Sequence, residues 1–224
     1  MSSNLKKALL IFAKRPVPGM VKTRLVPAIS PEQAADLYRC MLGDIMAKVQ
    51  SNPRFDSYLF YLETNGACDY FGIYAPGITL LPQKGKDLGE KMAEAFHAVF
   101  SRGYATAIIV GSDAPDLPLH YIEAAFDRLE RRECEAVFGP CEDGGYYLLG
   151  MRMLNTALFR DVPWSSNEVL AVSLERAREA GIKVSLLPVW HDVDEAADLE
   201  RRELLDEGNG APLTRAFLRN LLKR

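Results

Sequence analysis

The chain has 224 residues, of which 48% are hydrophobic and 25% are charged, and its formal net charge is −3. This length and composition are typical of one globular α/β domain spanning residues 1–224, which buries enough surface to fold without disulfides or a structural metal. The small negative charge gives no electrostatic basis for binding nucleic acid or an anionic membrane. The opening residues 1–7 are too short for a signal peptide or a membrane span, so we expect a cytoplasmic protein.

Cysteine and histidine spacing points to no metal cluster. The three histidines are far apart and lack the spacing of zinc ligands. The cysteines form no Cys-x-x-Cys pair, and we interpret them as free thiols in a reducing compartment. They are Cys40, Cys68, Cys134 and Cys141.

Short apolar runs bounded by turn residues predict buried strands, and apolar residues three and four positions apart predict helices. Ser30 with Gln33, and Asp87 with Glu90, predict the starts of two helices. The segment 68–76 is ambiguous. In chain order the predicted elements are a strand at 8–13, a helix at 31–50, strands at 58–62 and 78–81, a helix at 88–101, a strand at 107–110, a helix at 118–132, strands at 135–139 and from 146, a helix at 167–180, a strand at 183–187 and a helix at 213–222.

The run 107–110 predicts a central strand buried on both faces, as in a parallel sheet. It stops at Gly111-Ser112-Asp113. Because ligands of open α/β sheets bind beyond the carboxyl ends of the strands, we expect Asp113 to lie at a binding site. A carboxylate there can hold a divalent cation against a phosphate.

The loop after the first strand is rich in cations. Its side chains Lys14, Arg15, Lys22 and Arg24 suit phosphate oxygens, and Gly19 lets the backbone approach a ligand closely. A solvated surface loop is the alternative. No G-x-x-x-x-G frame precedes Lys22-Thr23, which disfavours a P-loop kinase.

Two glycine positions indicate close approach to a ligand. Gly89 lies in the first turn of a predicted helix, where a base or sugar could pack against it, although a plain helix start explains it equally. Asp143-Gly144-Gly145-Tyr146 suits a tight turn before a strand. The same stretch also lets a substrate touch main chain, with the Asp143 carboxylate free to accept hydroxyls.

Two later segments add candidates. Trp164 follows a proline and either covers a sugar or acceptor or anchors the core. Asp194 is the expected N-cap of the helix that it begins. Asp192, on the alternating side of the extended chain, is then free to point into a site.

Four motifs occur in sequence order, namely Phe12–Leu25, Asp87–Met92, Gly111–Leu117 and Gly139–Gly150. Together they resemble those of the radical-SAM/selenodomain-associated transferases, a glycosyltransferase-like family. That family is similar to the nucleotide-diphospho-sugar transferase superfamily, which includes phospholactate guanylyltransferase and molybdenum-cofactor nucleotidyltransferases. The resemblance implies a single-domain GT-A-type sandwich with a mixed, mostly parallel sheet and helices on both faces. It also implies a nucleotide against Ala13 and the basic loop, including Thr23, and Mg²⁺ or Mn²⁺ at Asp113.

From these observations we expect a metal-dependent glycosyltransferase that uses a nucleotide-sugar donor and a small-molecule acceptor. The alternatives are a nucleotidyltransferase that moves NMP from an NTP to a phosphorylated small molecule, and a nucleotide-binding protein without catalysis. Asp113 is the expected main metal ligand, with Asp192 or Asp194 as the second, and Asp143 is expected to orient the acceptor or act as a weak base.

The chain departs from the superfamily pattern in two places. Prolines replace most glycines of the first loop, and the metal strand ends in Ser112-Asp113-Ala114 where Asp-x-Asp is common. Base, sugar, acceptor and oligomeric state therefore stay open at this stage.

Overall fold

A seven-stranded mixed sheet forms the centre of the computed structural model, which describes residues 6–50 and 52–223. The strands are ordered β3-β2-β1-β4-β6-β5-β7 across the sheet. β6 pairs antiparallel with β4 and β5, while the other strands run in one common direction. Residues 1–5, on which the prediction about a signal peptide rests, lie outside the described residues. The strands are β1 (Lys7–Ala13), β2 (Asp56–Tyr61), β3 (Thr79–Pro82), β4 (Thr106–Val110), β5 (Ala136–Pro140), β6 (Tyr146–Met151) and β7 (Val184–Leu186).

β4 is the middle strand of the seven, as the sequence predicts, and all five of its residues are buried. Its side chains alternate between two hydrophobic cores, with Ile108 and Val110 in one and Ala107 and Ile109 in the other. A strand covered on both faces needs apolar residues at every position, which explains the uninterrupted apolar run.

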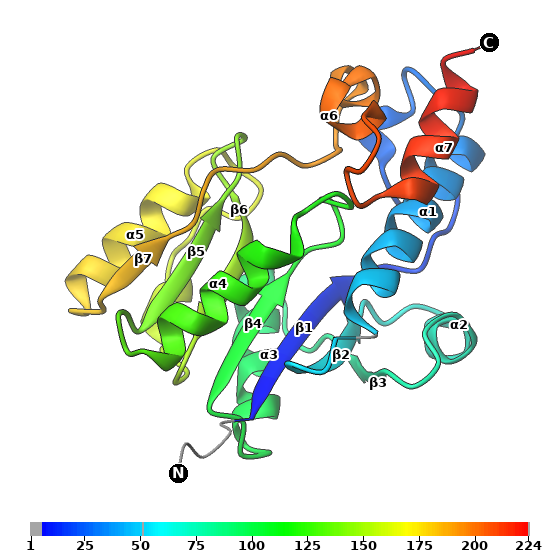
Figure 1. The fold of residues 1–224 in the computed structure, drawn as a ribbon. Coiled ribbons are helices and arrows are strands. Elements are labelled where there is room, and N and C mark those ends of the chain that lie inside the picture. Colours follow the sequence, from blue (N-terminus) through cyan, green and yellow to red (C-terminus); the bar gives the residue numbers. More distant parts are fainter. Residues whose placement is uncertain (1–5, 51, 224) are drawn as a thin grey trace.

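Helices cover both faces of the sheet. Figure 1 shows α4 in front of the sheet and α3 behind it. The core on the α4 side also takes side chains from α1, α2, α6 and α7, and the core on the α3 side takes side chains from α5. Among the described residues, no helix is both long enough and apolar enough to cross a membrane. The helices are α1 (Pro31–Val49), α2 (Ala67–Tyr74), α3 (Leu88–Phe100), α4 (Leu119–Glu130), α5 (Val169–Glu179), α6 (Arg202–Leu205) and α7 (Pro212–Leu221).

The predicted helix starts are confirmed at atomic detail. The Ser30 hydroxyl accepts from the Gln33 amide at 3.2 Å, and the Gln33 side chain accepts from the Ser30 amide at 2.9 Å. The Asp87 carboxylate accepts from the Glu90 amide at 2.8 Å and so begins α3. The ambiguous segment 68–76 forms most of α2.

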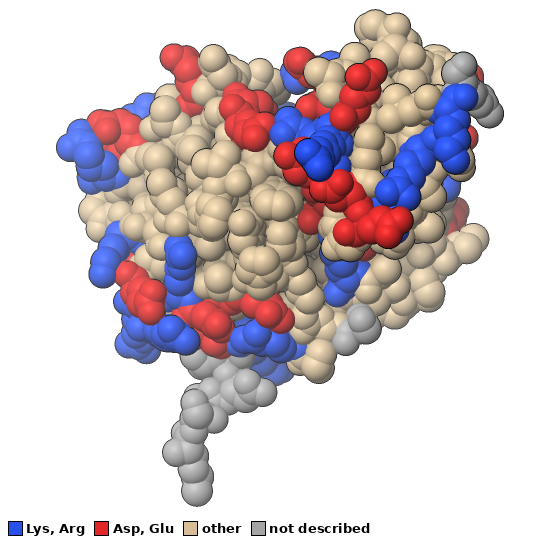
Figure 2. Space-filling model, turned by 45° about the horizontal axis from the view of Figure 1, so that its top comes forward, with Lys and Arg blue, Asp and Glu red and all other residues tan. Residues whose placement is uncertain are grey.

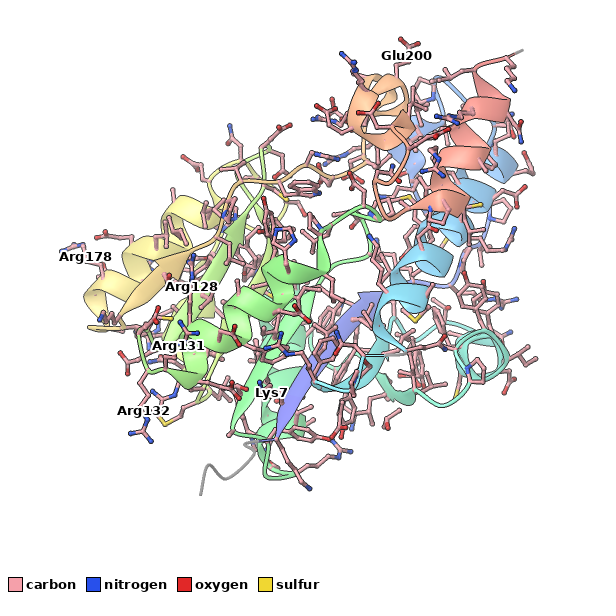
Figure 3. All side chains as sticks on the ribbon, in the orientation of Figure 1. Lys7, Arg128, Arg131, Arg132, Arg178 and Glu200 are labelled. Carbon is pink, nitrogen blue, oxygen red and sulfur yellow. The ribbon has the colours of Figure 1, made fainter. Side chains whose placement is uncertain are left out.

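Polar side chains fasten the covering helices to the sheet. Arg128 of α4 donates to the Ser185 hydroxyl at 2.8 Å and to the Leu186 carbonyl at 2.7 Å, which ties α4 to the edge strand β7 (Figure 3). Lys7 of β1 pairs with Glu130 at the end of α4 at 2.8 Å. The predicted fold class, an α/β sandwich with a mixed, mostly parallel sheet, is confirmed.

The strand directions bring distant loops together. β1, β4, β5 and β7 run the same way, so the loops that follow them leave from one edge of the sheet. We call this edge the carboxyl edge. Figure 2 brings the top of Figure 1 forward and shows Asp and Glu side chains beside Lys and Arg side chains on that side of the molecule.

Candidate active site

Two adjoining hollows open at the carboxyl edge, with volumes of about 480 Å³ and about 530 Å³. We call the first the β1 hollow, because the loop after β1 lines it, and the second the β5 hollow, because the turn after β5 lines it. Asp113, Arg24 and Asp194 lie on the wall that both hollows share. Such a two-part cleft beyond the strand ends is where open α/β sheets bind ligands.

Backbone hydrogen bonds between distant segments build the shared wall. The amide of Val193 donates to the carbonyl of Asp113 at 2.9 Å, and the amide of Glu142 donates to the carbonyl of Trp190 at 3.1 Å. The chain after β7 thus lies beside the ends of both β4 and β5. Because Val193 is fully buried, the side chains on either side of it, Asp192 and Asp194, point the other way, toward the cleft.

Lys22 is the buried cation of the site. It adopts a left-handed backbone conformation (φ 49°), and its side chain is only 3% exposed. Its ammonium contacts the Asp113 carboxylate and lies 2.9 Å from Asp194, while Arg24 lies 3.6 Å from Asp194. Burial opposes the charge of Lys22, but the two carboxylates outweigh it and raise the pKa of Lys22 above its usual value. Lys22 therefore stays charged.

Tyr38 of α1 supports the base of the cleft. Its hydroxyl accepts from the Lys14 amide at 3.1 Å and shares a hydrogen bond of 2.6 Å with Ser112. Burial, and then the nearby Asp113, raise the pKa of Tyr38 to about 12, so the hydroxyl keeps its proton. In the sequence Tyr38 lies in the middle of a helix and away from every strand end, so no local pattern marks it as a site residue.

A group of possible metal ligands lies in the β5 hollow. Ligand atoms of Cys141, Asp143 and Asp192 all lie within 4.8 Å of one another. Burial, and then Asp143 and other nearby carboxylates, raise the pKa of Asp192 to about 6. Burial also raises the pKa of the Cys141 thiol, and a soft sulfur ligand suits Mg²⁺ or Mn²⁺ less well than the two carboxylates do.

The donor set fits a hard divalent cation. Oxygen ligands are those that Mg²⁺ and Mn²⁺ prefer, and Asp113, Asp143, Asp192 and Asp194 all present carboxylates to the cleft. The side chain of Asp113 is 48% exposed even while it contacts Lys22, so one side of this carboxylate faces the hollow. The structure thus brings the predicted ligands Asp113 and Asp192 to one cleft, and it groups Asp192 most closely with Asp143.

Most of the predicted nucleotide-binding loop lines the β1 hollow. Ala13, Lys14, Lys22, Thr23 and Arg24 all do so. Two predicted members lie outside the hollows. Arg15 donates to the Asn65 carbonyl at 2.6 Å, and Gly19 has a positive φ of 75° with open space around it.

Protein atoms, not a ligand, fill the space beside two of the predicted glycines. A Cβ atom on Gly89 would lie 2.6 Å from the ring of Trp164, so the indole occupies the place expected for a base or sugar. A Cβ atom on Gly144 would lie 2.0 Å from the Asn167 carbonyl oxygen, and Gly144 has a φ of 87°. Packing against neighbouring residues therefore explains both glycines, and each of them positions a residue that lines the β5 hollow, Trp164 or Asn167.

The other predicted substrate residues line the β5 hollow. Asp143, Gly145, Tyr146 and Trp164 all contribute to its wall. The Asp143 carboxylate accepts from the Gly145 amide at 2.8 Å, which fixes the turn beside the hollow that Asp143 lines.

The prediction that Asp194 is a helix N-cap is wrong. Glu195, not Asp194, is the N-cap of the short 3₁₀ helix Ala196–Glu200. The Asp194 carboxylate instead pairs with Lys22 and Arg24. The two-residue spacing from Asp192 is the signal that could have identified it, because residues two apart on an extended chain share a side.

The chain is similar to several known proteins. A family model described as an uncharacterized protein conserved in bacteria (DUF2064) matches residues 45–166. The 2-phospho-L-lactate guanylyltransferase of Methanothermobacter thermautotrophicus is 27% identical over 205 residues, which are 89% of this chain and 85% of that protein. A structure from Desulfovibrio desulfuricans G20, provisionally described as a nucleotide-diphospho-sugar transferase, is 31% identical with a TM-score of 0.85 and covers 96% of this chain and 97% of its own.

A more distant structure shares the fold alone. The CMP:2-keto-3-deoxy-manno-octonic acid synthetase solved with CTP has a TM-score of 0.57 at 12% identity, and the match covers 87% of this chain and 95% of that one. The closer similarities confirm that the chain is an enzyme of the transferase class with the fold of nucleotide-diphospho-sugar transferases. The predicted radical-SAM association stays a prediction. Since the family model matches more than half of the sequence, the chain belongs to the DUF2064 family.

Proposed function

We propose that the chain is a metal-dependent nucleotidyltransferase, which moves a nucleoside monophosphate from an NTP to a small-molecule acceptor. The observation that carries this proposal is the basic loop after β1, which lines one hollow together with Asp113 and has a second hollow adjoining it. The similarity to a guanylyltransferase over most of both chains supports nucleotidyl transfer over glycosyl transfer.

The charge of the β1 hollow suits the phosphates of the NTP. Lys14, Lys22 and Arg24 line it against two carboxylates, Asp113 and Asp194. An ammonium or guanidinium near the phosphates offsets the negative charge that grows on the leaving pyrophosphate. The Lys22 ammonium is already desolvated and held in place by Asp113 and Asp194, so it presents a fixed positive charge to a phosphate bound in the hollow.

Asp113 and Asp192 would hold Mg²⁺ or Mn²⁺, with Asp194 beside them. A divalent cation at this place stabilises charge on the phosphate oxygens. In the proposed reaction the acceptor oxygen bonds to the α-phosphorus, and the bond from that phosphorus to the oxygen bridging to the β-phosphate breaks. Asp143 orients the acceptor from the β5 hollow.

Glycosyl transfer from a nucleotide-sugar is the second candidate, and the structure from D. desulfuricans favours it by its description. The two reactions differ in the released product. Nucleotidyl transfer releases pyrophosphate, whereas glycosyl transfer releases a nucleoside diphosphate. Product analysis by anion-exchange chromatography therefore separates them without knowledge of the acceptor's identity.

Calorimetric titration of NTPs and nucleotide-sugars with Mg²⁺ or Mn²⁺ tests the site itself. We expect metal-dependent NTP binding that weakens about tenfold or more in Asp113→Ala, since one metal–carboxylate contact is lost. Glu142→Gln is the matched control, because Glu142 pairs with Arg201 at 3.0 Å and lines neither hollow. Unchanged affinity in Asp113→Ala with metal present would refute the metal proposal. Equal affinity for NTPs and inorganic sulfate would reduce the site to a non-specific anion pocket.

A further inference from the structure

The two hollows differ sharply in charge. Three cations and two carboxylates line the β1 hollow. Five carboxylates and one guanidinium line the β5 hollow. An ionised carboxylate accepts hydrogen bonds but cannot donate them, so it pairs with hydroxyl groups and repels a phosphate. The β1 hollow is thus suited to the phosphates of the donor, whereas the β5 hollow repels a second anionic group.

One divalent cation does not reverse this balance. Lys22 contacts two of the five carboxylates, Asp113 and Asp194, and Arg24 lies near Asp194. Two protein cations and one divalent cation together still carry less charge than the five carboxylates that line the β5 hollow. Asp143 and Glu195 have no cationic side chain within ion-pair distance in the described residues.

The uncharged lining of the β5 hollow suits a hydroxyl-rich molecule. Trp164 and Tyr146 give it aromatic walls, and Ser165, Ser166 and Asn167 add neutral polar groups. The indole of Trp164 is held in place because it packs on Gly89. A fixed aromatic face with carboxylates and hydroxyls around it combines apolar contact with acceptors for several O–H donors.

We infer that the acceptor is an uncharged, hydroxyl-bearing molecule of the sugar or polyol class, and that one of its hydroxyls, not a phosphate, is the nucleophile. The inference rests on the proposed nucleotidyl transfer. The hydroxyl oxygen bonds to the α-phosphorus, its proton passes to the Asp143 carboxylate, and pyrophosphate leaves with the electrons of the broken P–O bond. The product is a phosphodiester, whereas a phosphate acceptor such as the one in the name of the guanylyltransferase relative gives a diphosphate.

The test compares matched probes that differ by one phosphate. Glucose, myo-inositol and glycerol are titrated beside glucose 6-phosphate, myo-inositol 1-phosphate and glycerol 3-phosphate, with Mg²⁺ and inorganic triphosphate present to occupy the basic loop. Trp164 reports binding by its fluorescence in a Trp190→Phe background, which removes the second tryptophan of the chain. Calorimetry on the wild-type protein gives the same comparison if that background is unstable.

We expect at least one uncharged probe to bind about tenfold more tightly than its phosphorylated partner. Asp143→Asn keeps the acceptor for the Gly145 amide, so the turn is retained while the charge is lost, and the preference should narrow. Glu142→Gln removes the same charge one residue away, outside the hollow, and should leave the preference unchanged. Tighter binding of the phosphorylated partners, or no response to any uncharged probe up to about 100 mM, would overturn the inference. Failure of the proposed function is a separate result, namely absent NTP binding in the titration above.

Discussion

Removal of the Lys22 ammonium should destabilise the protein through the carboxylates that it leaves behind. Loss of one partner from a fully buried ion pair costs about 3–5 kcal/mol, and an exposed pair contributes about 0–1 kcal/mol. The Lys22 side chain is 3% exposed, whereas Asp113 and Asp194 are 48% and 35% exposed, so water screens part of the interaction. For Lys22→Met, which keeps the apolar stem, we therefore expect a loss of about 1–3 kcal/mol.

Thermal unfolding followed by circular dichroism measures this loss. For a chain of this size about 1 kcal/mol lowers Tm by about 2–4 °C, so the expected decrease is about 2–12 °C. Lys14→Met is the control, because it removes a cation from the same loop that makes no side-chain ion pair among the described residues. In the double variant Lys22→Met/Asp113→Asn one of the two carboxylates that lose Lys22 is neutral, and we expect a coupling free energy of at least about 0.5 kcal/mol.

The pH dependence follows from the direction of the pKa shift. The folded pKa of Lys22 lies above the unfolded value of about 10.4, so its contribution to stability is complete at neutral pH and is lost only as the pH rises through the folded pKa. The difference in Tm between wild type and Lys22→Met should thus stay constant from pH 7 to pH 9. The buried ion pair does not stabilise the fold if Lys22→Met and the Lys14→Met control have the same Tm. The same conclusion follows if the effects of Lys22→Met and Asp113→Asn on the free energy of unfolding are additive.

Three further predictions concern other parts of the fold. The pKa of Asp192 is raised from 3.8 to about 6, so ionisation of this carboxyl destabilises the metal-free protein. In melts with a chelator present, Asp192→Asn should therefore raise Tm at pH 7.5 but not at pH 3.5, and an equal effect at both pH values would contradict this. The Asp44 carboxylate accepts from two backbone amides at the start of α7, at 3.0 and 2.8 Å, so Asp44→Ala should lower the free energy of unfolding in urea by about 2–3 kcal/mol. A loss below about 0.5 kcal/mol would show that this cap contributes little. Gly89→Ala gains up to about 1 kcal/mol of helix propensity but places a Cβ atom 2.6 Å from the Trp164 ring, so we expect a lower Tm and altered Trp164 fluorescence. The control Gly72→Ala, which has open space around it, should raise Tm. A higher Tm for Gly89→Ala would mean that Trp164 moves freely.

Most elements of the fold could be predicted because their signals are local, whereas α2 was ambiguous and the short α6 was not predicted. The Ser30 and Asp87 caps depend on residues three positions away, and both form as expected. The apolar run 107–110 needs only its own composition to indicate a strand covered on both faces. Asp113 could be placed at a binding cleft by the same logic, because a residue after a buried parallel strand lies at the carboxyl edge.

Which site residues meet, and in what charge state, was decided by tertiary structure alone. Lys22 is separated from Asp113 by 91 positions and from Asp194 by 172, and no local pattern encodes these contacts. The Gly89 position looked open in the sequence, but Trp164, 75 residues later, fills it. The side chain of Arg15 likewise turned to a carbonyl at Asn65 and not to the cleft.

The physical reason is the range of the forces involved. Hydrogen-bonded caps and apolar periodicity act within a few residues, so the sequence by itself determined most of the helices and strands and the edge of the sheet at which the cleft opens. Burial and Coulomb interactions depend on every segment that packs around a group, whatever its distance along the chain. Only the assembled sheet therefore decided that one hollow is basic, that its neighbour is acidic, and that Lys22 joins them.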